Sequence, residues 1–465
     1  MRRARVNERT RNPQPLLPSR LPSGRGAMEQ PNNTDDVAEL SVRFWIALVL
    51  TAFAAGLLGA LMMWILSGVQ HLAYDYRDGT FTGAVESSST VRRLMAPLIG
   101  GAVVGFAWWW LRRKTVGGSD VDDAVWSGSG EVAMPRSFGT SVLSEVSVGV
   151  GASLGKEAAP KVLGAASASL LALWFGLNAG QRRLLVACGA GAGMGAVYNV
   201  PIGGALVTAE LLMGQLVLPV IIPALVCSAV ATSVSWVYLP MVPIYDGLPS
   251  FAVHPSQIAF AVLVGPLVGV LGVVLVRLIG WVSHRQLRGR WVIVAPMVAF
   301  TAVGAIGLHY PLLLGNGKDL IQLAFVGTLG GGLATLLVLT VLKPLLTALC
   351  LGSGASGGLF TPVMSTGAVL GLLLGRLWLH VWPGPSAASL ALLIAAAMTG
   401  AAMQAPLAAV VLVVELTGTS ESIIVPMVIA TAIATGVTRR LDGYSIYSAR
   451  LPARSDQEPL DALHA

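Results

Sequence analysis

Apolar segments follow one another along almost the whole chain between residues 42 and 438, separated by short polar stretches. The first, at about 42–68, is long enough to cross a hydrocarbon layer of roughly 30 Å with tilt to spare. Several later segments have 10–15 residues, fewer than a straight crossing needs. We therefore expect an all-α polytopic membrane protein in which some helices are interrupted, because helices satisfy their backbone polar groups internally. The remaining apolar segments lie at about 93–111, 141–156, 158–176, 181–195, 202–213, 216–238, 257–282, 291–308, 320–328, 332–350, 359–381, 387–402, 406–417 and 420–438.

The composition agrees with this class: 54% of the residues are hydrophobic and 11% are charged. The 54 glycines and 26 prolines fall within apolar runs as well as between them, which favours close helix packing and broken helices. The net charge of +7 comes largely from the two ends, so it indicates topology rather than nucleic-acid binding. We expect no nucleic-acid partner and, with six scattered histidines, no metal site and no cofactor.

Polar tails flank the apolar part. Residues 1–40 are rich in Arg and Pro and lack the apolar core of a signal peptide, and residues 453–465 form a short polar end. Between them, 41–452 is expected to be one transmembrane domain. Both ends of that domain are basic, so we expect both termini in the cytoplasm and an even number of crossings of the cell membrane. The short stretch 117–140 is too polar to cross lipid and is expected to be re-entrant.

An internal repeat has a period of about 200 residues. In each half a small-rich turn, an amide residue, a proline and an apolar run lead to Glu-Leu at the same offset. Halves of about 41–245 and 250–452 with matching breaks are typical of transporters whose site lies between the halves. Chance likeness of Gly/Ala/Leu-rich segments is the alternative, but Pro and Glu coincide as well. The matching runs are Tyr198–Ile202 with Ala209–Leu211, and Met403–Leu407 with Val414–Leu416.

The run Gly155-Lys156-Glu157-Ala158-Ala159-Pro160 places two charges in apolar surroundings, where a charge costs about 2.5–3.5 kcal/mol and is usually functional. A Gly-rich run followed closely by proline predicts a helix start inside the membrane. The free N–H groups of such a start form an anion site. We expect the deprotonated carboxylate of Glu157 to occupy that site and the protonated carboxyl to leave it. The alternative is a structural ion pair with Lys156.

Other candidates are weaker when taken alone. The run Gly357-Gly358-Leu359-Phe360-Thr361-Pro362 predicts a second helix start with an anion nest, or else a packing turn. Ser119 could donate its hydroxyl to an anion, although Gly-Gly-Ser is also an ordinary linker. The phenol of Tyr447 could point into a pore, or it could belong to an interface belt. For Glu210 and Glu415 we favour a structural role, with a proton relay as the alternative.

Together these residues resemble the CLC family of chloride channels and anion/proton exchangers over nearly all of 42–452. Residues 155–160 are similar to the family motif G-[KR]-E-G-P, with Ala158-Ala159 as a departure, and Gly358-Leu359-Phe360-Thr361-Pro362 matches G-x-F-x-P. The resemblance implies two inverted halves of tilted, partly broken helices and a homodimer. It implies Glu157 as the gate that couples anions to protons. The implied anion ligands are Ser119, Leu359, Phe360 and Tyr447.

Two further departures bear on function. Asp120 follows Ser119, and a carboxylate beside an anion site repels the anion unless it points away. Leu211 stands where proton-coupled relatives have an inner glutamate, so Glu210 or water must replace that group, or the protein is uncoupled. We predict transport of chloride or a similar monovalent anion, by antiport with protons, and keep a passive voltage- or pH-gated channel as the alternative. More distant alternatives are a fluoride exporter of the same fold and an intramembrane serine protease using Ser356 and His380.

Overall fold

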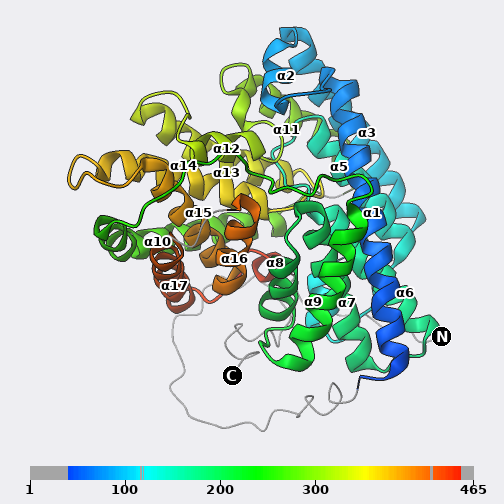
Figure 1. Ribbon diagram of the computed structural model, residues 1–465. Helices are drawn as coiled ribbons and strands as arrows, with labels where there is room; N and C mark the ends of the chain where they lie inside the picture. The colour runs from blue at the N-terminus through cyan, green and yellow to red at the C-terminus, as the bar shows by residue number, and fades with distance from the viewer. Residues whose placement is uncertain (1–39, 116–117, 119, 288, 419–422, 452–465) are drawn as a thin grey trace, which may run out of the picture.

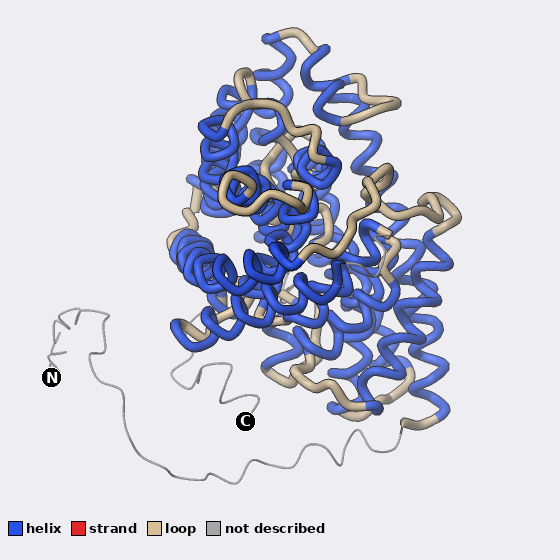
Figure 2. Tube along the Cα trace, turned by 60° about the vertical axis from the view of Figure 1, so that its left-hand side comes forward, coloured by secondary structure: helices blue, strands red, loops and turns tan. Residues whose placement is uncertain are grey.

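The computed structural model describes residues 40–115, 118, 120–287, 289–418 and 423–451. All regular structure in these ranges is helical, apart from one isolated backbone bridge (Figures 1 and 2). The first half holds α1 (Val42–Tyr74), α2 (Phe81–Ser87), α3 (Thr90–Lys114), α4 (Val121–Trp126), α5 (Met134–Gly149), α6 (Ala158–Trp174), α7 (Ala179–Tyr198), α8 (Pro201–Leu206), the π-helix η2 (Val207–Leu212) and α9 (Leu218–Ser235). The second half holds α10 (Pro255–His284), α11 (Trp291–Gly307), η3 (Pro311–Leu313), α12 (Lys318–Val326), α13 (Leu333–Gly352), α14 (Phe360–Trp378), α15 (Ala387–Met403), α16 (Pro406–Thr417), α17 (Ile424–Leu441) and η5 (Ser448–Arg450).

Helices long and apolar enough to cross a bilayer recur along the described chain. There are seven of them, and shorter apolar helices of 10–17 residues lie between them. This mixture is the expected pattern of a membrane fold with interrupted helices. The seven are α1, α3, α9, α10, α13, α14 and α17.

The centre of the molecule is formed by helices that start or end inside it. Of the window that qualifies α14 as a span, 83% is buried, compared with 39–56% for the other six helices. In the first half α6 packs on α7, and in the second half α14 packs on α15. Glycines allow the first of these contacts, because a Cβ on Gly164 would collide with the carbonyl of Gly189. Each half therefore contributes a pair of closely packed, largely buried helices to the core.

The repeat seen in the sequence has a matching backbone. α7 is capped at its C-terminal end by Asn199, and α15 is capped by Gln404. Both capping residues adopt left-handed conformations, with φ of 55° and 58°. A new helix starts two residues later in each case, with Pro201 or Pro406 at its first position. Asn tolerates the left-handed region, and proline suits a first helical turn. These residues thus break the helix at equivalent positions in both halves.

One helical segment expected from the sequence has different bounds in the structure. The apolar run 141–156 is not a single helical piece: α5 begins seven residues earlier, at Met134, and ends at Gly149. The chain then leaves the helix through residues 150–157, where Gly151 has φ of +100°, a conformation that side-chain-bearing residues rarely adopt. The polar stretch before it contains the short helix α4. Apolar character alone did not reveal that residues 150–156 form a turn.

Candidate functional site

Two turns from opposite halves meet at the start of α6 and the start of α14. The N–H of Gly155 donates to the carbonyl of Gly358 at 2.7 Å, and the N–H of Gly358 donates back at 2.8 Å. α6 then begins at Ala158 and α14 begins at Phe360. The helix starts expected around Pro160 and Pro362 are therefore confirmed, and the two turns are joined rather than placed on separate surfaces.

The carboxylate of Glu157 lies on the N-terminus of α14. Its Oε1 accepts a hydrogen bond of 2.7 Å from the backbone N–H of Phe360. Its Oε2 accepts bonds of 2.9 Å from the Tyr198 hydroxyl and 3.2 Å from the Thr361 hydroxyl. The Glu157 residue is 2% exposed. A negative charge is thus held by an N–H group at the positive end of a helix dipole and by two hydroxyls, and no cation among the described residues forms an ion pair with it.

Two cavities approach this turn, and neighbouring residues line different ones. The first, the Tyr447 cavity, has a volume of about 190 Å³ and is lined by Glu157, Leu359 and Tyr447 among others. The second, the Lys156 cavity, has a volume of about 180 Å³ and is lined by Lys156 and residues of α1, α2 and α12. The two cavities share no lining residue, and the turn at residues 156–157 contributes to both.

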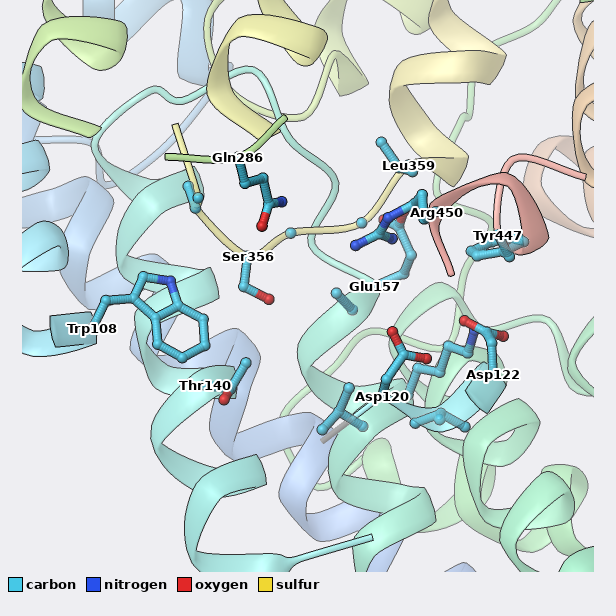
Figure 3. A pocket seen from close by; sticks show the side chains of 18 of the residues that line it. Trp108, Asp120, Asp122, Thr140, Glu157, Gln286, Ser356, Leu359, Tyr447 and Arg450 are labelled. Atoms are coloured by element: carbon cyan, nitrogen blue, oxygen red, sulfur yellow. The ribbon is translucent and has the colours of Figure 1, made fainter. Parts of the chain in front are cut away.

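Figure 3 looks into the Tyr447 cavity, with Glu157 near its centre. Tyr447 and Asp122 lie to its right, and Trp108 and Thr140 lie to its left. The walls come from α3, α4, α5, α6, the 354–359 turn and the end of the described chain at η5. The cavity is thus assembled from both halves of the protein.

An ion pair forms part of this wall. The ammonium of Lys161 lies 2.7 Å and 3.0 Å from the two carboxylate oxygens of Asp122, and both residues are buried. The same ammonium lies 4.4 Å from the ring centroid of Tyr447, a cation–π contact. Asp120 instead caps α4, because its side chain accepts a bond of 3.0 Å from the N–H of Asp123. One carboxylate near the cavity is therefore paired with a cation, and the other is engaged by a helix N-terminus.

The expected site residues are distributed as follows. Glu157, Leu359 and Tyr447 line one cavity, and Phe360 supplies the N–H that Glu157 binds. Ser119 lies outside the described residues.

Glu210 and Glu415 bind backbone groups across the boundary between the halves. Each carboxylate accepts two N–H bonds, of 3.1 and 2.6 Å, from the first turn of a broken helix in the opposite half. The donors are Leu407 and Ala408 in α16 for Glu210, and Ile202 and Gly203 in α8 for Glu415.

Sequence reasoning did not identify four polar residues of the site: Tyr198, Thr361, Lys161 and Asp122. Lys161 could have been noticed, since it follows Glu157 by four residues and so lies one helical turn further along α6. Thr361 lies inside the second helix-start motif itself. Tyr198 and Asp122 are separated from their partners by 41 and 39 residues, and no local pattern announces such pairs.

The serine protease alternative is wrong. Ser356 lies before α14, and His380 lies beyond its other end, so a helix of 19 residues separates them. Such a helix is roughly 28 Å long, far beyond hydrogen-bond reach.

The fold and the site define a polytopic helical membrane protein whose central pocket lies between two joined helix breaks. A sequence model of the family described as "Voltage gated chloride channel" matches residues 100–439. The chain belongs to this family, the CLC family, whose members transport anions and are not enzymes.

Named relatives agree with this assignment. The voltage-gated ClC-type chloride channel ClcB of Shigella boydii serotype 18 is 30% identical over 419 residues, which cover 86% of this chain and 95% of that protein. ClcB of Salmonella typhimurium is 29% identical over 385 residues, covering 79% and 89%.

Solved structures share the fold. A slow cyanobacterial Cl⁻/H⁺ antiporter superposes with a TM-score of 0.76 at 22% identity, over 88% of this chain and 97% of that one. A CLC-type fluoride/proton antiporter superposes with a TM-score of 0.70 at 21% identity, over 89% and 99%. The expected all-α fold is thereby confirmed.

Proposed function

We propose that this chain exchanges chloride for protons and that Glu157 is its protonatable gate. One observation carries the proposal: the Glu157 carboxylate occupies the N-terminus of α14 at a turn that borders both cavities. A helix N-terminus in a low-dielectric setting binds a small anion in the same way as it binds a carboxylate. Chloride and the ionised Glu157 side chain therefore compete for one place.

Protonation decides the competition. The ionised carboxylate accepts the Phe360 N–H and both hydroxyls, and it closes the site. A neutral carboxyl is a much weaker acceptor, so it gives up the N–H group and leaves room for chloride. Because the ligands are dipoles rather than fixed cations, the bound anion is held weakly enough to depart.

The other site residues have distinct proposed roles. The N–H groups of Leu359 and Phe360 would bind the anion once Glu157 has moved. Tyr447, which lines the cavity, would form its inner constriction. Ser119 would contribute a hydroxyl, as the family motif implies.

Glu210 is the candidate for the inner part of the proton path. Glu210 and Leu211 line a further cavity of about 290 Å³, together with Arg439. This cavity gives Glu210 access to water, but its two backbone bonds favour a structural role. The apolar Leu211 in place of an inner glutamate is the observation that favours the rival function, a passive chloride channel.

The proposed orientation in the membrane rests on the basic ends of two helices, and the proposed assembly rests on the family. α3 ends in Arg112, Arg113 and Lys114, and α17 ends near Arg439 and Arg440. The positive-inside rule places these ends in the cytoplasm, with the Tyr447 cavity on the same side, since Arg112 also lines it. We propose a homodimer in the cell membrane, by analogy with the family.

The test is anion efflux from liposomes that contain the purified protein, with pH recorded at the same time. We expect chloride efflux to drive proton movement in the opposite direction, and Glu157→Gln to carry chloride without protons. A reversal potential that ignores a proton gradient would establish the passive channel instead. Undiminished coupling in Glu157→Gln would remove Glu157 from the gate. The same vesicles loaded with fluoride decide between chloride and fluoride as the preferred anion.

A further inference from the structure

The proposed mechanism leaves the buried ion pair of Lys161 and Asp122 without a role. Lys161 is 7% exposed and Asp122 is 8% exposed, yet both line the Tyr447 cavity rather than the packed interior. Lys161 stands one turn along α6 from Glu157, on the same face of the helix. The pair therefore lies in the wall of the same cavity that Glu157 lines, one helical turn from it.

A buried ion pair gains little stability over apolar side chains of the same size, because both charges lose their water. Its position at a cavity wall suggests a use other than stability. The Lys161 ammonium has three N–H donors and no acceptor. The carboxylate oxygens of Asp122 occupy two directions around it, and the Tyr447 ring lies against it as well.

The positive and negative side chains that line the cavity nearly cancel one another in charge. Lys161 and Arg450 are the cations that act on the Asp122 carboxylate, and Asp120 is the acid that acts on it. Arg112 and Glu157 are the remaining charged residues that line the cavity. An anion that entered would be repelled by Asp122 and attracted by Lys161 at nearly the same point.

We infer that Lys161 is a second anion-binding station, one helical turn from the Glu157 site, and that Asp122 is a tethered competitor for it. The inference rests on the proposed anion transport. A monovalent anion arriving from the cavity displaces the Asp122 carboxylate from the Lys161 ammonium, and the carboxylate returns when the anion leaves. No bond is made or broken other than these contacts.

Competition between Asp122 and the anion for Lys161 would keep anion binding reversible. A lone buried ammonium would hold an anion too tightly for rapid release, and conduction requires binding that is weak enough to reverse. A tethered carboxylate lowers the apparent affinity without removing the attraction. The arrangement also explains how an acidic residue can line an anion cavity without closing it.

The experiment measures chloride binding to the detergent-purified protein by titration calorimetry and chloride efflux from liposomes. In Asp122→Asn the competitor loses its charge, so we expect chloride to bind about tenfold more tightly and to be released more slowly. In Lys161→Gln we expect binding about tenfold weaker. Glu131→Gln is the matched control, since it neutralises the acid of an exposed ion pair with Arg182, and it should leave both quantities unchanged.

Unchanged chloride affinity in Asp122→Asn would overturn the inference. So would a double variant, Asp122→Asn with Lys161→Gln, that regains the affinity and the efflux of the unmodified protein, because the pair would then be a structural tether. A measurement without variants guards against misfolding: crystals grown in bromide should show anomalous density against the Lys161 ammonium, and its absence there would also count against the station. If the unmodified protein carries no anion at all, the proposed function fails first.

Discussion

Glu210 and Glu415 each accept hydrogen bonds from the opposite half of the protein, in equivalent geometry. Glu210, in the first half, accepts two N–H bonds from the first turn of α16, and Glu415, in the second half, accepts two from the first turn of α8. The corresponding bond lengths agree at 3.1 and 2.6 Å. Because a helix N-terminus leaves its first N–H groups without intrahelical partners, each carboxylate satisfies two of them.

This reciprocity predicts equal losses of stability. Glu210→Ala and Glu415→Ala each leave two N–H groups without their carboxylate, at a cost of about 1–3 kcal/mol for each group that water does not reach. We expect both variants to lower the thermal unfolding temperature in detergent by similar amounts. Differential scanning fluorimetry of the two variants side by side checks this.

Glutamine variants of Glu210 and Glu415 distinguish a structural role from a role as proton relay. Glu210→Gln and Glu415→Gln both keep one acceptor oxygen and lose the titratable group. If Glu210 carries protons, only its variant should lose proton coupling in liposomes. We expect the two variants to behave alike, and a selective loss in Glu210→Gln would contradict the structural role.

Tyr198 should control the pH at which the gate opens. Its hydroxyl donates to the Glu157 carboxylate at 2.9 Å, and a hydrogen bond to an ionised group favours that ionised form. Tyr198→Phe removes this donor, so the closed position of the Glu157 carboxylate is stabilised less. The half-maximal pH of chloride efflux should move upward by about one unit, since a bond to a charged group contributes about 1.5–3 kcal/mol.

Tyr245→Phe is a matched control for that variant. Tyr245 is also fully buried, but its hydroxyl has no hydrogen-bond partner among the described residues. Its ring packs edge-on against Phe325, with centroids 5.5 Å apart, and phenylalanine keeps that contact. We expect no shift of the pH profile in Tyr245→Phe, and a shift as large as that of Tyr198→Phe would show that a general loosening is responsible.

Glu145 should lower the stability of the protein. It is fully buried in α5, and neither carboxylate oxygen has a hydrogen-bond partner within the described part of the chain, although Lys156 attracts it electrostatically. A buried group of this kind costs about 1–3 kcal/mol, which an apolar side chain of similar length avoids. Glu145→Met should therefore raise the unfolding temperature in detergent, and the exposed Glu131→Gln should not. A fall in Glu145→Met would mean that the attraction between Glu145 and Lys156, or an internal water or ion, stabilises the carboxyl in place.

The helix breaks were predictable because their chemistry is local. Pro160 and Pro362 mark helix starts by their fixed φ, and Glu157 is conspicuous because charge is rare among apolar residues. The repeat was visible for the same reason, since a proline and a glutamate recur at one spacing. The exit of the chain from α5 depended instead on the φ of Gly151, which hydropathy does not register.

The partners within the site were not predictable, because they meet only through the tertiary fold. Tyr198 reaches Glu157 from the end of α7, and Asp122 reaches Lys161 from α4. The sequence raised the problem of an acidic side chain near an anion site but not its resolution. Only the packing of α4 against α6 shows that Asp122 is paired.

Gly358→Ala should exclude both the Glu157 carboxylate and chloride from the N-terminus of α14. A Cβ on Gly358 would collide with the carboxylate of Glu157 in its bound position. The backbone itself permits alanine there, since φ of Gly358 is not in the left-handed region. The collision is with the far end of a flexible side chain, so rotation of Glu157 relieves it. Because chloride competes for the same place as the carboxylate, the methyl group obstructs both, and we expect a folded protein with little chloride efflux at any pH. Efflux that persists at high pH would show that chloride does not use the place that Glu157 occupies.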